Sequence, residues 1–392
     1  MATRTISNTG GNYNSTGTWV EGVVPTSADD VIATATSGQL TVNVASAALS
    51  LNLSAYTNTI TMTNSLTVTN DIRLSSGMSF AGSGALTSIG TATITTNGKL
   101  IPAFSFSTSS VVRTLNDDLN CTNLTGSVSA TFNGNNLNVQ GDLTCGINLI
   151  QGTTVFKTTG TGAQNVNFQL FSNTLNFSHS GTVTVNAGAI GPSVNGSVIY
   201  TSGSFAAGSA LLKFNGVLGT INLSTSGMTW DKIYYLNPST TTSINLNQDL
   251  KFTELYMGGA ASSSTPKLSF IGTGRIQQGT IYMGHCSVNT GGLITYFGTN
   301  LSFTTGATYN LTNLYTYGDG TTYRNTISSN TAGTKANINV SGITSLNFTQ
   351  FTDIAMASPT NVLNGSLSNT TNLTNISQWG SATAGGSYTF VN

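Results

Sequence analysis

Short apolar segments that alternate with small polar residues recur along the whole chain and limit the folds it can adopt. Apolar side chains occupy every second position within a segment, and Gly, Asn and Ser separate one segment from the next. This period of two is the signature of β-strands that bury one face. Representative segments are Leu137–Val139, Val166–Phe168, Ile244–Leu246 and Ile338–Val340. We therefore expect an all-β protein that is built from many short strands.

The composition supports strands and excludes several classes of protein. Charged residues make up 6% of the 392 residues, against about 25% in an average soluble domain. Thr, Ser, Asn and the 44 Gly favour strands and turns over helices. The 12 basic and 12 acidic residues balance, so no positive excess is present to bind nucleic acid. Disorder driven by net charge is excluded as well, because 38% of residues are hydrophobic.

Neither a membrane span nor a secretory signal is predicted. No apolar segment approaches the roughly 20 residues that a helix needs to cross a membrane. The segment Met1–Asn8 has one Arg but no apolar run behind it, unlike a signal peptide. A neutral surface of hydroxyls and amides is typical of structures outside cells. A chain with such a surface and no leader is expected to be a processed product, the cargo of a dedicated secretion system, or a virion protein that host lysis releases.

Three segments align without a gap and indicate an internal repeat. They share the pattern apolar, x, apolar, x, x, Asp, apolar, x, apolar, and they are Ser65–Leu74, Asn136–Cys145 and Ser243–Phe252. In a weaker fourth copy, Arg113 replaces the first apolar residue. Each copy is interpreted as a strand, a corner and a second strand. The predicted corner residues are Asp71, Asp118, Asp142 and Asp249, since an aspartate can accept a hydrogen bond from its own backbone two residues on.

The spacing of the corner aspartates predicts coils of roughly 20–25 residues. The interval from Asp118 to Asp142 fits one such coil, and the interval from Asp71 to Asp118 is close to twice as long. Such a repeat predicts a single-domain right-handed parallel β-helix, or β-solenoid, in which equivalent strands pair at about 4.8 Å. Its open ends need caps. We predict an N-terminal cap over residues 1–36, coils over 37–356 and a C-terminal cap or tail over 357–392.

The same alignment predicts the core. The apolar residues in the aligned positions should be buried, and they are Leu66, Val68, Ile72, Leu74, Leu137, Val139, Leu143, Ile244, Leu246, Leu250 and Phe252.

Bulky and rigid residues cluster in the first 36 positions. They follow the order Thr-Trp, then Gly-x-x-Pro, then an Asp before alternating apolar residues. The matching residues are Thr18-Trp19, Gly22, Pro25 and Asp29-Asp30. Tyr13 stands where a Trp is usual. This order resembles the start of β-helical repeats in bacterial surface proteins and phage structural proteins. The coil repeats are similar to those of adhesins, tailspikes and other virion β-helices. The resemblance implies a surface or virion protein, with Trp19, Pro25, Asp29 and Asp30 in the cap.

These features predict a non-enzymatic structural protein on the surface of a bacteriophage virion, either a capsid decoration or a tail or host-attachment element. The expected location is the virion, outside the cell after lysis. Expected partners are other virion proteins, host surface glycans and further copies of the chain; neither nucleic acid nor a cofactor is expected. The first alternative is a bacterial surface adhesin with a β-helical passenger, located on the bacterial cell surface.

A polysaccharide depolymerase of the tailspike type is the second alternative, because β-helices often carry enzymes that cleave glycans with paired acids. Corner and cap positions account for seven of the twelve acids. Among the rest, Asp231 and Glu254 are separated by about one predicted coil, and with Asp319 they are the candidate catalytic acids. Trp230 and Tyr234 are the candidate carbohydrate-binding aromatics. Scattered surface charge explains the same acids without any activity.

Cysteine and histidine are too few for a metal site. His285 and Cys286 are neighbours, and neighbours in a strand point to opposite faces, so we predict no bound metal. Cys121 and Cys145 occupy the same position in two copies of the repeat. We therefore expect them on adjacent coils as buried free thiols, with Cα atoms about 5 Å apart. Cys286 is expected elsewhere.

Overall fold

The computed structural model divides the chain into two compact units. The first unit comprises Met1–Gly188 and Thr201–Ala206, and the second comprises Ala189–Tyr200 and Ala207–Asn392. The structure describes residues 1–128, 130–171, 174–186, 197–205, 211–215, 219–225, 229–236, 242–258, 267–284, 299–317, 325–342, 344–345 and 349–356. Within these ranges the one helix is the short 3-10 helix η1 (Thr16–Thr18), and no helix is long and apolar enough to cross a membrane.

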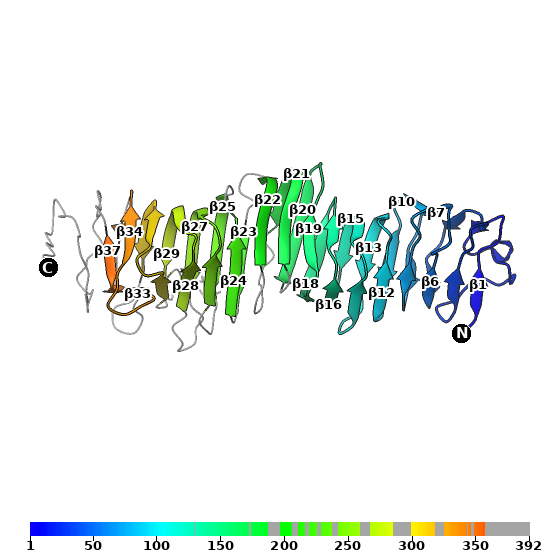
Figure 1. Ribbon diagram of the computed structural model, residues 1–392, viewed down its shortest axis with the longest axis horizontal. Helices are drawn as coiled ribbons and strands as arrows, with labels where there is room; N and C mark the ends of the chain where they lie inside the picture. The colour runs from blue at the N-terminus through cyan, green and yellow to red at the C-terminus, as the bar shows by residue number, and fades with distance from the viewer. Residues whose placement is uncertain are drawn as a thin grey trace, which may run out of the picture. The chain divides into compact units, whose positions relative to one another are not determined.

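Strands of the first unit follow one another in chain order (Figure 1). They are β1 (Thr3–Thr5), β2 (Gly11–Asn12), β3 (Asp30–Ile32), β4 (Leu40–Val42), β5 (Ser46–Ala48), β6 (Ser50–Asn52), β7 (Thr59–Met62), β8 (Leu66–Val68), β9 (Ile72–Arg73), β10 (Ser79–Gly82), β11 (Ala85–Ser88), β12 (Ala92–Thr95), β13 (Leu100–Phe106), β14 (Val112–Leu115), β15 (Leu119–Gly126), β16 (Ala130–Gly134), β17 (Leu137–Val139), β18 (Leu143–Gly152), β19 (Val155–Thr158), β20 (Gln164–Phe171) and β21 (Thr174–Asn186). Strand β22 (Ser197–Phe205) has residues in both units.

The second unit continues with strands of similar length. They are β23 (Leu211–Asn215), β24 (Gly219–Ser224), β25 (Thr229–Leu236), β26 (Thr242–Leu246), β27 (Leu250–Gly258), β28 (Lys267–Gly272), β29 (Ile276–Met283), β30 (Asn300–Phe303), β31 (Thr308–Leu311), β32 (Asn313–Thr316), β33 (Asn325–Ser329), β34 (Ala336–Val340), β35 (Thr344–Ser345), β36 (Thr349–Thr352) and β37 (Ile354–Met356).

Each strand pairs in parallel with the equivalent strand of the next coil, which makes both units parallel β-helices. In the first unit, one series of pairs runs β1–β3–β6–β9–β12–β14–β16, a second begins β2–β4–β7–β10, and a third runs β5–β8–β11–β13. In the second unit the series are β22–β24–β26–β28–β30–β33–β36, β23–β25–β27–β29–β32–β35 and β31–β34–β37. The predicted all-β, parallel β-helical class is confirmed; the hand of the coil and the cap boundaries stay predictions.

Coil length differs along the chain. In the first unit, Leu66, Leu86, Phe104, Leu124 and Leu143 lie one above the other in register, so a coil takes about 20 residues or slightly fewer there. In the second unit, Ile221 lies opposite Ile244, and Leu268 lies opposite Leu301. The interval from Leu268 to Leu301 is the longer of the two and exceeds about 30 residues. The coils are thus both shorter and longer than predicted, because the number of residues between one strand and its partner on the next coil varies along the chain.

All the predicted core residues are buried. Each of the eleven is 0% exposed except Leu66, which is 1% exposed. Burial of each such side chain stabilises the fold by about 1.5–3 kcal/mol. The alternation therefore predicted correctly which side chains point inward.

The predicted register of the repeat is wrong in the first unit. Cys121 of β15 lies opposite Val139 of β17, whereas Cys145 of β18 lies opposite Gly126 of β15. The two cysteines are therefore not stacked on adjacent coils, and the interval between them is not one coil. Cys121 is buried and forms no disulfide, as expected. The side chain of Cys145 and the whole of Cys286 lie outside the described residues.

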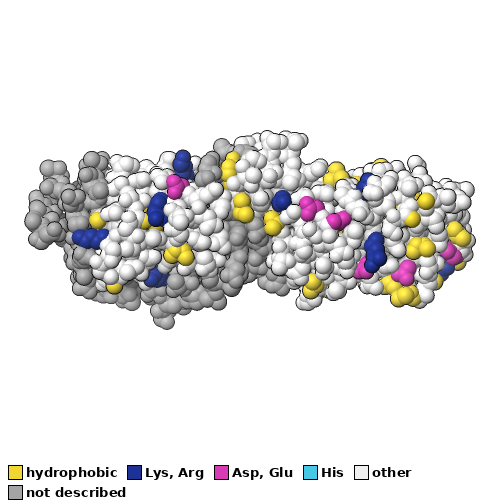
Figure 2. Space-filling view, in the orientation of Figure 1, with side chains coloured by type: hydrophobic (Ala, Val, Ile, Leu, Met, Phe, Trp, Pro, Cys, Tyr) yellow, Lys and Arg dark blue, Asp and Glu magenta, His cyan; other side chains and the backbone are white. Residues whose placement is uncertain are grey.

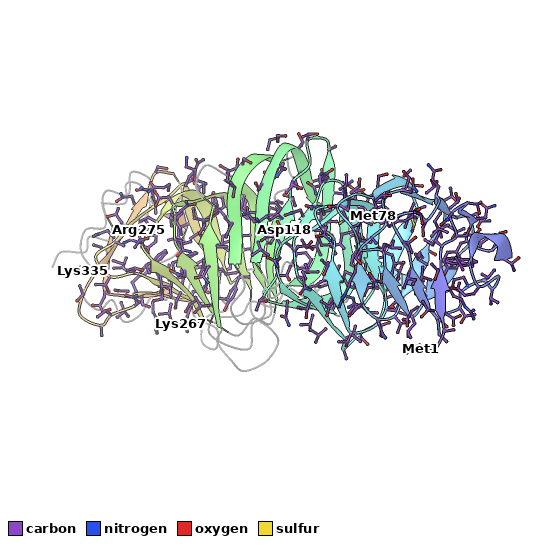
Figure 3. The ribbon with its side chains drawn as sticks, turned by 45° about the vertical axis from the view of Figure 1, so that its right-hand side comes forward. Met1, Met78, Asp118, Lys267, Arg275 and Lys335 are labelled. Atoms are coloured by element: carbon purple, nitrogen blue, oxygen red, sulfur yellow. The ribbon has the colours of Figure 1, made fainter. Side chains whose placement is uncertain are left out.

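The corner aspartates explain this error. Asp71 precedes β9 in the first series of pairs. Asp118, which is labelled in Figure 3, precedes the part of β15 that pairs with β17. Asp142 precedes β18, which pairs with the later part of β15. They occupy three different corners of the coil. Each corner produces the same local pattern, since any turn between two half-buried strands interrupts the alternation in the same way.

Two aromatic rings pack together near the first strands. Tyr13 and Trp19 are each 2% exposed, and their ring centroids lie 5.0 Å apart, edge to face. The Trp19 indole N–H donates to the Tyr13 carbonyl at 2.9 Å, and the Tyr13 hydroxyl donates to the Ala47 carbonyl of β5 at 2.7 Å. Pro25 is also buried. These contacts tie the segment before β3 to β5, which is the first strand of the third series.

Asp29 holds the same segment together through its carboxylate. The backbone N–H and the hydroxyl of Thr26 donate to Oδ2 at 3.0 and 2.9 Å, and the Ala2 N–H donates to Oδ1 at 3.2 Å. Nε of Arg4 lies 3.7 Å from Oδ2. Hydrogen bonds from Thr26 lower the pKa of Asp29 below its ordinary value of 3.8. Next in sequence, Asp30 accepts a hydrogen bond from the Ser50 hydroxyl.

We expect acid to destabilise this segment, and Asp29→Asn to reduce the effect. Because the folded pKa is lower than the unfolded one, the carboxylate stabilises the fold above pH 3.8, and that contribution is lost as the pH falls through the folded pKa. Thermal unfolding followed by circular dichroism between about pH 5 and pH 2 measures this dependence. The Tm of Asp29→Asn should fall less steeply than that of the wild type over this range. Parallel curves would contradict the assignment.

Arg113 is a buried cation in the core of the first unit. It is 0% exposed and takes an inward-facing position of β14, where the other copies of the repeat have an apolar residue. Its Nε donates to the Ser88 hydroxyl at 3.0 Å and its Nη2 to the Ser88 carbonyl at 2.8 Å, while Nη1 has no hydrogen-bond partner among the described residues. The rings of Phe106 and Phe132 lie 5.5 and 5.7 Å from the guanidinium carbon. Burial lowers the pKa of Arg113 to about 10.

Arg113→Met should therefore stabilise the first unit. The substitution removes a desolvated charge and keeps an unbranched side chain of comparable length, so we expect the free energy of unfolding to rise by about 1–4 kcal/mol. Arg73→Met is the matched control, because the Arg73 side chain is 57% exposed, and we expect a change within about 0.5 kcal/mol. Urea unfolding measures both. A loss of stability in Arg113→Met would mean that its contacts with Ser88 outweigh the cost of burying the charge.

Candidate functional site

The candidate catalytic acids Asp231 and Glu254 lie on paired strands of the second unit, but at non-equivalent positions. The register of β25 and β27 sets Trp230 opposite Phe252 and Lys232 opposite Glu254. Asp231 therefore lies one position before the residue that faces Glu254. The true repeat is one position shorter than the interval between the two acids, which is why they are not equivalent. Asp319, the third candidate, lies outside the described residues.

Glu254 is engaged by two neighbours on the sheet surface. Nζ of Lys232 lies 3.3 Å from Oε2, and the Tyr256 hydroxyl donates a hydrogen bond of 2.9 Å to the same oxygen. The ammonium group of Lys232 also lies 5.8 Å from the centroid of the Tyr256 ring. These contacts give Glu254 a structural explanation that requires no substrate.

Four tyrosines form a stack on the outer surface of the second unit, which we call the tyrosine column. Its members are Tyr234 of β25, Tyr256 of β27, Tyr282 of β29 and Tyr315 of β32, and each lies in register with the next. The ring centroids are separated by 5.4, 4.8 and 5.0 Å, and the ring planes by 13, 9 and 8°. All four side chains are partly exposed.

The column follows from the pleat of the strands. Residues on either side of each tyrosine point inward, as Leu255 and Met257 around Tyr256 are both 0% exposed. Parallel in-register pairing then places the tyrosines one above the other at about the strand spacing. The ring faces cover each other, so the ring edges and hydroxyl groups are what the column presents to solvent. The sequence points to Tyr234 but does not reveal the column, because the intervals between successive tyrosines are unequal.

The phenols in the middle of the column remain protonated at neutral pH. Burial raises the pKa of Tyr256, and its hydrogen bond to Glu254 raises it further. Burial also raises the pKa of Tyr282, with a further contribution from the charge of Glu254. Both hydroxyls therefore keep their proton, and Tyr256 donates its own to Glu254.

Trp230 cannot contribute to this surface. Its side chain is 0% exposed, which excludes its ring from contact with a glycan. Of the two candidate carbohydrate-binding aromatics, only Tyr234 reaches the outside.

The four predicted corner aspartates bind the next coil. Each Oδ1 accepts a hydrogen bond from the backbone N–H of the residue one coil on, and we call these contacts the corner hydrogen bonds. They join Asp71 to Thr93 at 2.8 Å, Asp118 to Asn136 at 3.0 Å, Asp142 to Asn165 at 2.9 Å and Asp249 to Arg275 at 2.9 Å. The acceptor thus serves a neighbouring coil, whereas we expected a bond within the same turn. A charged acceptor makes such a bond stronger than a neutral one.

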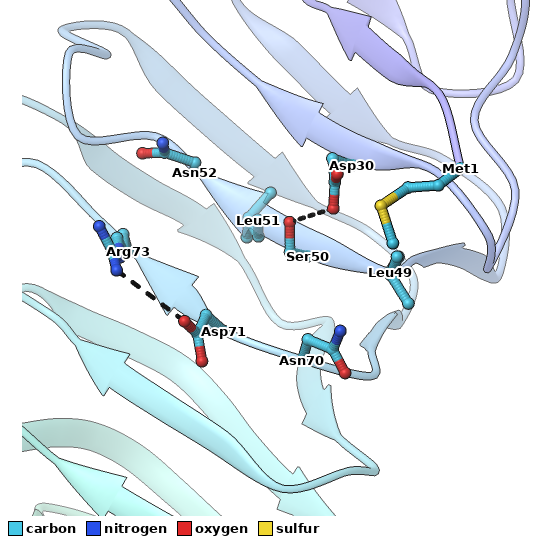
Figure 4. A pocket seen from close by; sticks show the side chains of 9 residues that line it. All are labelled: Met1, Asp30, Leu49, Ser50, Leu51, Asn52, Asn70, Asp71 and Arg73. Carbon is cyan, nitrogen blue, oxygen red and sulfur yellow. Dashed lines mark hydrogen bonds and ion pairs between the residues drawn. The ribbon is translucent and has the colours of Figure 1, made fainter.

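A pocket of about 250 Å³ opens on the first unit beside β3, β6 and β9 (Figure 4). Its charged groups pair with their neighbours: Asp30 accepts from Ser50, and Nη2 of Arg73 lies 3.9 Å from Asp71. The side chains of Arg73 and Asp71 are 57% and 44% exposed. Two solvated, mutually paired charges provide little to position a substrate.

Metal ligands are not clustered in the part of the chain that the structure describes: no group of three or more His, Cys, Asp or Glu could hold an ion there. His179 is 3% exposed, with Nδ1 3.3 Å from the Thr158 hydroxyl and Nε2 3.0 Å from the Ser204 carbonyl. Both ring nitrogens thus lie against internal partners. His285 and Cys286 lie outside the described residues.

Comparison with protein-family models, with curated proteins and with solved structures gave no match to this chain.

Proposed function

We propose that this chain is a non-enzymatic structural protein on the surface of a bacteriophage virion, where it serves as a capsid decoration or as a tail or host-attachment element. The observation that carries the proposal is the set of corner hydrogen bonds. Asp71, Asp118, Asp142 and Asp249 each hold a backbone amide of the next coil. A glycan-cleaving enzyme needs a pair of carboxylic acids at its active site. In this chain these four carboxylates hold the coils together instead.

The described surface favours assembly with other copies and with other virion proteins. Few charged side chains appear on the face seen in Figure 2, and they are scattered among uncharged polar groups. The net charge of the chain is zero. Copies that carry no net charge do not repel one another at long range, which suits the repeated packing of a particle surface.

Bonding between coils also suits a protein that must persist outside a cell. Parallel ladders join each coil to the next along every series of strands, so local opening requires several backbone hydrogen bonds to break together. The same rigidity would present host surface glycans with a fixed row of side chains. The proposal thus includes location in the virion, with other virion proteins, further copies of the chain and host surface glycans as partners.

Antibody labelling of particles tests the location. Antibodies raised against the purified chain and coupled to gold are applied to phage particles from lysates of the host and viewed by electron microscopy. We expect regular labelling of capsids or tails. Labelling of intact bacterial cells, with bare particles, would contradict the proposal and favour the adhesin.

The purified protein should cleave no polysaccharide. We expect no release of reducing ends or unsaturated products from host capsule or lipopolysaccharide, and the variants Asp231→Asn and Glu254→Gln should behave like the wild type. Size-exclusion chromatography of the treated polysaccharide provides a second readout. Turnover that either substitution abolishes would overturn the non-enzymatic assignment and favour the depolymerase.

A further inference from the structure

The tyrosine column offers a linear array of identical polar groups at a nearly constant step. Its rings repeat at 4.8–5.4 Å over four consecutive coils and remain parallel to within 13°. Each member adds one phenolic oxygen, which can donate and accept, and one outward ring edge. A ligand that contacts the whole column must therefore be long, straight and periodic.

The stacking determines which part of a ligand the column can contact. Ring faces inside the column are covered by the neighbouring rings, so a sugar ring cannot stack on Tyr256 or Tyr282. Ring edges carry partial positive charge and attract oxygen atoms. A phenol that donates its proton, as Tyr256 does to Glu254, can also accept a hydrogen bond through its oxygen. Edges and hydroxyls together favour a ligand whose surface is rich in hydroxyl groups.

The charges beside the column favour a neutral ligand. Lys232 and Glu254 form an ion pair of 3.3 Å next to Tyr256, so they offset each other's charge. An anionic polymer would meet the carboxylate as well as the ammonium group, and would gain little net attraction.

We propose that the tyrosine column binds an extended, neutral β-linked glycan that lies along the column, with successive sugars over successive tyrosines. Such a chain advances per sugar by a distance close to the spacing of paired strands, so its hydroxyl groups meet the phenols in register. This inference deepens the proposed role in host attachment and rests on it for its biological meaning. Binding itself depends only on the column.

The first experiment measures affinity against chain length by isothermal titration calorimetry. The probes are soluble β-1,4-linked glucose and N-acetylglucosamine oligosaccharides, from the disaccharide to the hexasaccharide. We expect affinity to increase up to the tetrasaccharide and then to level off, because four tyrosines are present. The α-1,4-linked glucose oligosaccharides, which curl into a helix, should bind at least about tenfold more weakly. No binding by any β-linked probe, or affinity independent of length, would overturn the proposal.

The second experiment interrupts the column. Tyr282→Ala removes an inner member and should weaken tetrasaccharide binding at least about tenfold, while Tyr256→Phe should weaken it less. Tyr200→Phe is the matched control, since Tyr200 is partly exposed, lies on β22 and is outside the column. Thermal unfolding verifies that each variant is folded. Equal affinity of Tyr282→Ala and the control would contradict the assignment. Particle labelling is independent of both experiments, so loss of glycan binding would leave the virion proposal standing.

Discussion

Replacing Leu143 by Asp is expected to destabilise the first unit by at least about 4 kcal/mol. Leu143 is 0% exposed and lies between Leu124 of the preceding coil and Val166 of the following one. A carboxylate there has no basic side chain beside it in register, and its burial removes the water that stabilises its charge. Since a domain is typically stable by about 5–15 kcal/mol, the loss approaches the whole stability of the unit.

Thr144→Asp is the matched control, because Thr144 is the next residue of the same strand and is exposed. We expect it to change the free energy of unfolding by no more than about 0.5 kcal/mol. Urea unfolding followed by circular dichroism measures both variants. Equal effects at the two positions would mean that β18 does not alternate between inside and outside as described.

Gly126→Val is expected to cost about 3 kcal/mol or more, because the ring of Phe106 fills the space where a side chain would lie. Phe106 and Gly126 are in register on β13 and β15, and a Cβ built on Gly126 would lie 2.0 Å from Cζ of Phe106. That separation is far inside van der Waals contact. Phe106 in turn packs edge to face on Phe132, with ring centroids 5.2 Å apart, so it has little freedom to move away.

A double-mutant cycle separates this clash from other effects of the substitution. Phe106→Ala alone should cost about 3–5 kcal/mol through the cavity that it leaves. In the double variant the valine fills part of that cavity, so the combined loss should be smaller than the sum. Gly162→Val is the control, since nothing lies within 4 Å of a Cβ at that position. Additive losses at Gly126 and Phe106 would contradict the register of β13 and β15.

The direction of each core side chain was predictable, because alternation is a local property. A residue such as Leu143 or Ile244 lies between polar neighbours, and that suffices to assign it to the inside. Register was not predictable from the same pattern. Asp118 and Asp142 are each followed by the same apolar, polar, apolar order in sequence, yet they occupy different corners, since every corner of a coil imposes the same local constraint.

The candidate site was predictable only in part, because its residues meet through pairing across coils of unequal length. The sequence shows Tyr234 as an aromatic near Glu254, but Tyr282 and Tyr315 join it at unequal intervals that no periodicity reveals. The ion pair between Lys232 and Glu254 was hidden by a difference of one position between the apparent and the true repeat. Trp230 is a candidate carbohydrate-binding residue by its nearness to Asp231 in sequence, but its inward position in the alternation buries it.

The corner hydrogen bonds and the tyrosine column both depend on parallel, in-register coils, so the spacing between coils is the most direct test. Thr67, Thr87, Ser105, Thr125 and Thr144 lie opposite one another on five successive coils. Spin labels on Cys introduced at Thr67 and Thr144, with Cys121, Cys145 and Cys286 replaced by Ala, report the distance across four coil steps by double electron–electron resonance. At about 4.8 Å per step the backbone separation is about 19 Å. We expect one narrow distribution between about 15 and 30 Å once the label arms are included. A broad distribution, or a mean distance beyond about 35 Å, would contradict the stacked coils.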